Sequence, residues 1–274
     1  MDMKGRVLVV AGSDSGGGAG IQADIKTITA LNGFAMTAIT ALTAQNSLGV
    51  KGVHKPPPAF VTDQIRVTLE DLGADAVKTG MMADAPSIKA AAEALEEHAG
   101  GVPWIVDPVM YSSARDLLLD EDAAEALKAR LVSRAALVTP NMAEAEALIG
   151  RPVATVADME AAGQDLLDLG AGAALVTGGH LGGDTVTDVL VTADGAERFE
   201  GPRIDTPHTH GTGCTLASAV ATGLAQGMEL RDCVIRARAY VREAICTAPG
   251  YGAGHGPLNH AHTVRPFGDG SDAM

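Results

Sequence analysis

Short apolar runs rich in β-branched residues alternate along this chain with longer stretches of helical period that are rich in alanine and leucine. This alternation favours a central, mainly parallel sheet covered by helices, because parallel strands must be joined by long crossover connections. The expected strands cover residues 6–11, 35–42, 74–78, 104–106, 136–138, 173–177 and 188–192. The expected helices cover residues 20–31, 58–72, 86–98, 121–131, 142–148, 156–169, 213–225 and 230–247.

The alternation changes near residue 190. Two β-type segments, 189–192 and 197–200, flank the pair Asp194-Gly195. Asp-Gly tolerates the positive φ of a tight hairpin turn. We therefore expect an antiparallel hairpin at one edge of the sheet.

Composition limits the classes of protein. The 274 residues are 46% hydrophobic, show no repeat of fixed period and suit a single domain over 1–274, with a frayed tail over 267–274. A net charge of −14 argues against nucleic-acid binding, so an anionic ligand must be held by backbone amides or a metal ion. Three cysteines form no disulfide framework and no apolar run is long enough for a signal sequence or membrane span. We expect a cytoplasmic protein without membrane contact.

The first expected strand leads into a glycine-rich segment, 11–20, which opens a helix carrying Gln22 and Asp24. Ligands of parallel α/β sheets bind at such carboxyl ends of strands. The glycine spacing matches neither a dinucleotide fingerprint nor a Walker loop, which disfavours an NAD enzyme and a P-loop NTPase. The segment suits either a binding loop or a structural turn.

A second glycine-rich segment, 207–218, places Cys214 where another helical pattern begins. Gly211 and Gly213 allow close approach of a ligand, and the free N–H groups of a helix start form an anion site. A helix terminus favours the thiolate of Cys214, which indicates a base or nucleophile beside a phosphate. An ordinary loop with a small packed cysteine is the alternative.

Other candidate side chains follow the ends of the expected strands. Gln45 both donates and accepts, which suits it to the edge of a heteroaromatic ring, while Met81 and Val109 suit the faces of a flat ring. Asp107 suits a metal–phosphate unit. A solvated amide, two core residues and a turn carboxylate are the plain alternatives.

Asn141 and Glu144 are three residues apart, so one helical turn presents both to the same site. A helix cap with an exposed glutamate is the other interpretation.

The C-terminal part holds five histidines that invite a metal-site interpretation: His208, His210, His255, His260 and His262. A structural zinc site usually adds cysteines at Cys-x-x-Cys separation, which this chain lacks. We therefore expect capping or surface roles, with His210 shaping the loop before Gly211.

Taken together, these motifs resemble the hydroxymethylpyrimidine and phosphomethylpyrimidine kinases of thiamin biosynthesis, within the ribokinase-like superfamily. The resemblance covers nearly the whole chain and rests on residues 11–24, 39–46, 78–81, 107–110, 139–146, 178–181 and 209–216. It implies a three-layer α/β/α fold, a homodimer and two successive ATP-dependent phosphorylations with Mg²⁺. The first acts on a hydroxymethyl oxygen, and the second extends the monophosphate to the pyrophosphate.

The resemblance also implies roles for individual residues. Those expected to line the pyrimidine pocket are Gln45, Ala19, Asp24, Met81 and Val109. Those expected to form the anion hole around the transferred phosphoryl group are Gly211, Thr212, Gly213 and Cys214, with Cys214 as the base. Those expected near the ATP phosphates and Mg²⁺ are Asn141, Glu144, Thr177, Arg238 and Asp107, with Asp107 and Glu144 at the metal, partly through water.

The chain departs from the family pattern at some positions. Tyr111-Ser112-Ser113-Ala114 stands where the family often continues with a lysine, Thr177 replaces a lysine before Gly178, and Arg238 replaces one in the last helix. A threonine offers a hydroxyl in place of an ammonium charge, so these changes bear on ATP affinity and on the second phosphorylation.

Two alternative functions remain open. One is a vitamin B6 kinase, because a pocket for an aminopyrimidine methanol also admits a pyridine methanol. The other is a non-catalytic pyrimidine-binding regulator, which the residues at 111–114 and Thr177 would favour and the motif at 211–214 opposes.

Overall fold

The computed structural model describes residues 3–110 and 119–265. The departure from the family pattern at 111–114 and the expected tail over 267–274 lie outside the described residues.

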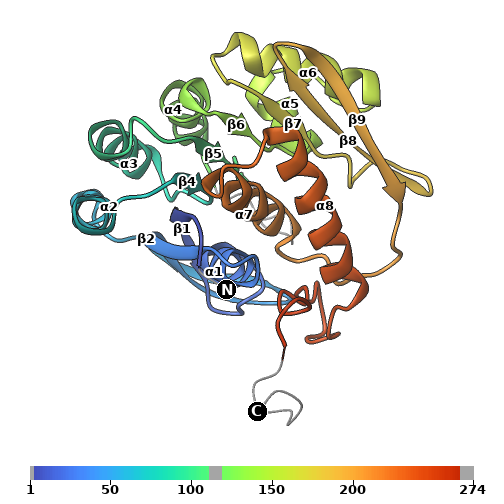
Figure 1. The fold of residues 1–274 in the computed structure, drawn as a ribbon, viewed down its shortest axis with the longest axis horizontal. Helices are drawn as coiled ribbons and strands as arrows, with labels where there is room; N and C mark the ends of the chain where they lie inside the picture. The colour runs from blue at the N-terminus through green and yellow to red at the C-terminus, as the bar shows by residue number, and fades with distance from the viewer. Residues whose placement is uncertain (1–2, 111–118, 266–274) are drawn as a thin grey trace.

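The sheet has nine strands in the order β3-β2-β1-β4-β5-β6-β7-β8-β9 (Figure 1). Its strands are β1 (Arg6–Asp14), β2 (Phe34–Asn46), β3 (Gly49–His54), β4 (Ala76–Thr79), β5 (Trp104–Val106), β6 (Leu137–Val138), β7 (Ala174–Val176), β8 (Thr185–Thr192) and β9 (Gly195–Pro202). Six neighbouring strands run parallel to one another, namely β2, β1, β4, β5, β6 and β7. Strands β3, β8 and β9 are antiparallel to their neighbours.

Helices cover both faces of the sheet, which gives three layers (Figure 1). The helices are α1 (Gly20–Ala30), α2 (Pro58–Leu72), α3 (Ala85–His98), α4 (Glu121–Arg130), α5 (Met142–Ile149), α6 (Val156–Asp168), α7 (Thr212–Ala225) and α8 (Leu230–Cys246), with a short 3₁₀ turn at Val132–Arg134. Leu8 and Val10 of β1 pack with α2 to α6, whereas Val7 and Val9 pack with α1, α7 and α8. This split follows from the two-residue alternation of side chains along a strand.

The expected three-layer fold and the antiparallel hairpin of β8 and β9 are confirmed. The sheet has a second antiparallel edge, β3, which the sequence did not predict. Gly49 and Gly52 weaken the strand pattern there, because glycine brings no side chain to pack on a pleated surface. Strand β2 also runs further than expected, to Asn46, where it pairs with β3.

The order of the strands fixes where a ligand can bind. From β1 the chain passes to β2 on one side, and it returns to place β4 on the other side of β1. In parallel sheets such a reversal opens a crevice at the carboxyl ends of the strands. The glycine-rich segment after β1 and the residues after β4 and β5 meet there.

Within residues 3–110 and 119–265, no helix combines the length and apolar character needed to cross a membrane.

Candidate active site

The two glycine-rich segments are joined by a buried carboxylate, Asp14 at the end of β1. Asp14 accepts hydrogen bonds from the backbone N–H groups of Gly16 (2.8 Å), Gly18 (3.0 Å) and Ala19 (2.9 Å), and His210 Nε2 lies 2.9 Å from Asp14 Oδ2. Burial opposes the charge on Asp14, but the hydrogen bonds from His210 and the backbone outweigh burial and lower the pKa of Asp14. His210 thus shapes the second segment by fixing it to the first, as expected.

Gly211 brings the two segments into direct backbone contact. It caps α7 with a φ of +86°, and a Cβ at this position would collide with the carbonyl oxygen of Gly18. Its own carbonyl accepts hydrogen bonds from the N–H and Oγ1 of Thr215, at 2.9 and 2.8 Å. His260 Nε2 lies 2.9 Å from Thr215 Oγ1, and burial lowers the pKa of His260 to about 4, so this histidine is neutral. Position 211 requires glycine, because a side chain there would disfavour the positive φ and would collide with Gly18.

The first turn of α7 presents open backbone beside Asp107. A Cβ on exposed Gly213 would lie 3.9 Å from Asp107 Oδ1, an ordinary contact distance. Thr212 instead turns its hydroxyl back to the carbonyl oxygen of Thr209, at 2.7 Å. Of the four residues expected in the anion hole, Gly213 is the one whose missing side chain leaves space facing Asp107.

Cys214 lies between the two glycine-rich segments and Asp107. Its sulfur interacts with the backbone N–H of Gly20, which lowers the pKa of Cys214, and with the Asp107 carboxylate, whose pKa it lowers. Burial, followed by the nearby carboxylates, raises the pKa of Cys214 to about 12. The expectation of a favoured thiolate was therefore wrong, because burial disfavours the charged form of Cys214 more than Lys78 and the Gly20 N–H favour it.

A fully buried lysine, Lys78 on β4, holds the carboxylates around this site. Lys78 Nζ lies 3.0 Å from Asp24 Oδ1 and 3.5 Å from Asp107 Oδ2, and Ser218 Oγ donates to Asp24 Oδ1 at 2.6 Å. Burial opposes the charge on Lys78, but Asp24, Cys214 and Asp107 together outweigh burial and raise the pKa of the ammonium group. Sequence reasoning missed this residue. The available signal was a lysine inside a strand that is otherwise buried and apolar.

Asp107 and Glu144 are both buried, and each disfavours the charge on the other. Burial raises the pKa of Asp107, and burial with the charge of Asp107 raises the pKa of Glu144 to about 8. Asp107 Oδ2 has only the 3.5 Å ion pair with Lys78, and the buried Thr139 Oγ1 has no hydrogen-bond partner among the described residues. This end of the sheet therefore holds unsatisfied oxygen atoms and two buried carboxyl groups whose charged forms are disfavoured.

Asn141 and Glu144 form a capping box at the start of α5. Asn141 Oδ1 accepts from the N–H of Glu144 at 3.0 Å, and Glu144 Oε2 accepts from the N–H of Asn141 at 2.9 Å. The cap in the second interpretation is therefore present, but Glu144 is buried rather than exposed. One carboxylate both starts the helix and lies beside Asp107.

The residues expected at the pyrimidine lie along the first glycine-rich segment. Thr43 Oγ1 donates to the carbonyl oxygen of Ser13 at 2.9 Å and lies 3.1 Å from Gln45 Oε1, which places the Gln45 amide beside this segment. A Cβ on Gly12 would lie 3.0 Å from the sulfur of Met81, so Met81 covers that glycine. Ala19 and Val109 are half-buried.

Asp24 differs from the other residues expected at the pyrimidine, because it is fully buried beneath them. Its carboxylate is engaged by Lys78 and Ser218. The structure therefore places Asp24 in a buried polar cluster with Lys78 and Ser218.

The residues expected at ATP are divided between two places. Thr177 follows β7, where its N–H donates to the carbonyl oxygen of Pro140 at 2.9 Å, beside Asn141. Arg238 of α8 is occupied elsewhere, because its Nε donates to Asp188 Oδ2 at 2.8 Å and its Nη2 to the carbonyl oxygen of Phe199 at 2.8 Å. Arg238 therefore reaches the loop after β7 through Asp188 and not with its own guanidinium.

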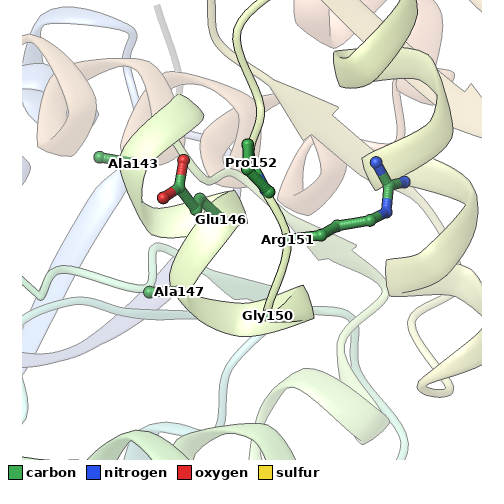
Figure 2. Close-up of a pocket in the computed structure, with 6 residues that line it drawn as sticks. All are labelled: Ala143, Glu146, Ala147, Gly150, Arg151 and Pro152. Carbon is green, nitrogen blue, oxygen red and sulfur yellow. The ribbon is translucent and has the colours of Figure 1, made fainter.

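A separate hollow of about 440 Å³ lies on the outer side of α5 (Figure 2). Its lining residues are Ala143, Glu146, Ala147, Gly150, Arg151 and Pro152. The side chain of Arg151 extends away from Glu146 and pairs with Asp165 at 2.7 Å (Figure 2). None of the expected site residues lines this hollow, so we assign the chemistry to the carboxyl ends of the strands.

The chain matches the family model described as phosphomethylpyrimidine kinase over residues 14–259. It is 50% identical over 94% of its length to a thiamine biosynthesis bifunctional protein of Geobacter sulfurreducens, and it spans 52% of that longer relative. It is 44% identical to the hydroxymethylpyrimidine/phosphomethylpyrimidine kinase of Bacillus subtilis, covering 93% of this chain and 94% of that one.

Among solved structures, an ADP complex of Bacillus subtilis pyridoxal kinase superposes with a TM-score of 0.86 at 35% identity, covering 94% of this chain and 98% of that one. The fold is thus that of the ribokinase-like kinases. These matches, over most of the chain, show that the protein belongs to the phosphomethylpyrimidine kinase family.

Proposed function

We propose that the protein transfers the terminal phosphoryl group of ATP to the hydroxymethyl oxygen of hydroxymethylpyrimidine, and then converts the monophosphate to the pyrophosphate for thiamin biosynthesis. The observation that carries this proposal is the start of α7, where the open backbone of Gly213 and the thiol of Cys214 face Asp107. Phosphoryl transfer depends on alignment and charge stabilisation, which a helix start and buried charges supply.

In this proposal the pyrimidine lies along the first glycine-rich segment. The amide of Gln45 would read the edge of the ring, because it can both donate and accept hydrogen bonds. Met81 and Val109 would contact the two faces of the ring, and Ala19 its edge. Asp24 would act from below, by fixing the position of Lys78.

Cys214 would receive the proton of the hydroxymethyl group. Because its own pKa is raised to about 12, the thiol is protonated near neutral pH. We infer that the substrate proton moves to the sulfur as the thiol proton passes to the Asp107 carboxylate, with which the thiol interacts. The alkoxide oxygen then attacks phosphorus, while the N–H groups of Gly213 and Cys214 stabilise the transferred group. Gly211 and Thr212 hold that turn in place.

The residues at the end of β5 and the start of α5 fit Mg²⁺. This ion usually takes one or two carboxylates and completes its shell with water and phosphate oxygens. Asp107 and Glu144 offer that pair, with an incompletely satisfied Asp107 Oδ2, and a cation would favour the ionised form of Glu144, whose pKa burial and Asp107 raise. When bound, the ion would neutralise developing charge on the phosphates. Among the described residues no group of three or more His, Cys, Asp and Glu side chains forms a metal cage, so the ATP phosphates would complete the site.

The ATP phosphates would extend from Asn141 toward the loop that follows β7. Thr177 would contribute its hydroxyl, and Arg238 would act through Asp188, which accepts the N–H of Gly178 at 2.9 Å.

We also propose a cytoplasmic homodimer. Its support is the open β2–β3 edge, which exposes Leu42, Leu48 and Val53. Light scattering of the purified protein and of a Leu48→Asp variant would test the dimer, since loss of an apolar contact at a dimer interface would shift the variant toward monomer.

The decisive experiment is ATP turnover over a panel of pyrimidine and pyridine alcohols, with both phosphorylated products separated by chromatography. We expect the highest kcat/KM for hydroxymethylpyrimidine, followed by formation of the pyrophosphate. Monophosphate without pyrophosphate would limit the protein to the first step.

The resemblance to a pyridoxal kinase structure favours vitamin B6 phosphorylation as the second candidate. A decisively higher kcat/KM for pyridoxal would select it. Pyrimidine binding without Mg-ATP binding in calorimetry would instead select the regulator.

A further inference from the structure

The loop between β7 and β8, residues 178–183, has little packing of its own. Gly179, Gly182 and Gly183 are exposed, and a Cβ on any of them would meet no atom within 4 Å. Only Leu181 of this loop is packed against the core. The shape of such a loop must come from hydrogen bonds, because glycine residues carry the largest conformational freedom.

One side chain supplies most of these hydrogen bonds. The guanidinium of Arg203, just after β9, donates to the carbonyl oxygens of Gly183 (2.7 Å), Gly179 (2.8 Å) and Leu181. Its own backbone N–H donates to the carbonyl oxygen of Asp184 at 2.7 Å. Arg203 therefore holds alternate carbonyls of the loop on one side.

The beginning of the loop is fixed by a second arginine acting at a distance. Asp188 accepts the N–H of Gly178 on Oδ1 at 2.9 Å and the Nε of Arg238 on Oδ2 at 2.8 Å. Gly178 is buried, and a Cβ there would collide with the carbonyl oxygen of Thr187. The first residue of the loop is thus locked to β8.

The direction of the carbonyls sets the direction of the amides. In a trans peptide the C=O and the following N–H point in opposite directions, and the described chain contains no cis peptide. The N–H groups of Gly182 and Asp184 therefore point away from the Arg203 guanidinium. Backbone N–H groups on one side of a loop can donate together to an anion.

We propose that Arg203 is a positioning residue for the nucleotide. It holds loop 178–183 in the conformation that turns its N–H groups toward the phosphates of the nucleoside triphosphate, with Asp188 and Arg238 fixing the start of the loop. This inference rests on the proposed kinase function. Thr177 stands where the family pattern has a lysine, which would supply a positive charge. In this proposal the backbone N–H groups of the loop stabilise the phosphates in its place.

The test compares Arg203→Gln and Arg203→Lys with the wild-type protein. Arg242→Gln is the matched control, since Arg242 also donates to a carbonyl at the end of β9, that of Pro202 at 2.6 Å, without reaching the loop. We expect Arg203→Gln to raise the KM for Mg-ATP about tenfold or more, with kcat and the KM for the pyrimidine alcohol changed less than about threefold. Arg203→Lys should restore little, because an ammonium group cannot hold three carbonyls at once.

Hydrogen exchange of the loop gives a readout that does not need turnover. We expect faster exchange over residues 178–187 in Arg203→Gln and unchanged exchange in the control. Unchanged exchange with unchanged KM for ATP would overturn the proposal, as would full rescue by Arg203→Lys, which would indicate a charge effect alone. A uniform loss of kcat and of both affinities would also overturn it. Absence of turnover in the wild-type protein would instead contradict the kinase function, leaving the exchange data to judge the loop.

Discussion

The two sides of the proposed active site are held by different means. On the alcohol side, Lys78, Asp24 and Asp14 are buried and paired through side chains that come from strands and helices distant in the sequence. On the nucleotide side, the loop 178–183 is exposed and is tied by Arg203 through backbone carbonyls.

This difference predicts that one side mainly determines the stability of the fold and the other mainly determines the affinity for ATP. A buried charge that loses its partner destabilises the whole fold, whereas a surface loop that loses a hydrogen bond changes mainly its own conformation. Substitutions on the alcohol side should therefore affect folding and catalysis together, and substitutions on the nucleotide side should affect ATP affinity.

We expect the largest effect from Lys78→Met, because this substitution removes the cation of the buried charge cluster on the alcohol side. The variant leaves Asp24 and Asp107 without their cation, and we expect the free energy of unfolding to fall by about 3–5 kcal/mol. Urea unfolding measures this change. Lys55→Met is the control, since its 3.2 Å pair with Asp84 is exposed and contributes about 0–1 kcal/mol. An equal loss of unfolding free energy in both variants would contradict the expected difference between buried and exposed ion pairs.

Cys214→Ala tests whether the alcohol side also carries the chemistry. Loss of the group that accepts the hydroxymethyl proton should lower kcat for the first phosphorylation by about 10²-fold or more, with little change in the KM for the pyrimidine. Steady-state kinetics measures both constants. Full turnover in this variant would exclude Cys214 from proton transfer.

The pH dependence of the free energy of unfolding tests the buried carboxyl group of Glu144, with Glu144→Gln as the comparison. The folded protein holds the Glu144 proton up to a pKa of about 8, whereas the unfolded chain releases it near about 4.3. Between these values the folded state binds more protons, so its free energy of unfolding falls as pH rises, by about 2 kcal/mol between about pH 6 and about pH 7.5. Urea unfolding across this range should show the slope in the wild-type protein and a flatter one in Glu144→Gln. Parallel curves would contradict the buried, protonated carboxyl.

Gly213→Ala has the smallest expected effect on stability and separates folding from function. The added methyl group meets only an ordinary contact at Asp107, so stability should be unchanged or raised by up to about 1 kcal/mol. The methyl group occupies the space facing Asp107, so kcat should fall. A stable variant with full activity would show that the phosphoryl group lies elsewhere.

Local patterns predicted most of the fold. Helix α2 and strand β5 have the expected bounds, and most other elements differ by one to three residues at an end. Strand β3 was missed because its stability comes from pairing with β2, whereas its own residues include two glycines. Pairing between strands is a non-local property that a short sequence window does not contain.

The site was predictable where a motif carries it and less so where distant groups meet. The capping box of Asn141 and Glu144 follows from a spacing of three residues. The protonated state of Cys214 depends on burial and on Asp107, which a helix start alone does not reveal. The role of Arg203 had no sequence signal, because its partners are backbone carbonyls whose positions no side-chain pattern specifies.

The contact of Gly211 with the carbonyl of Gly18 has a consequence for protein engineering. Neither glycine-rich segment can be exchanged alone for that of another kinase, since each occupies the space that the other lacks. A graft of alcohol specificity must move the segments around Asp14 and Gly211 as a matched pair.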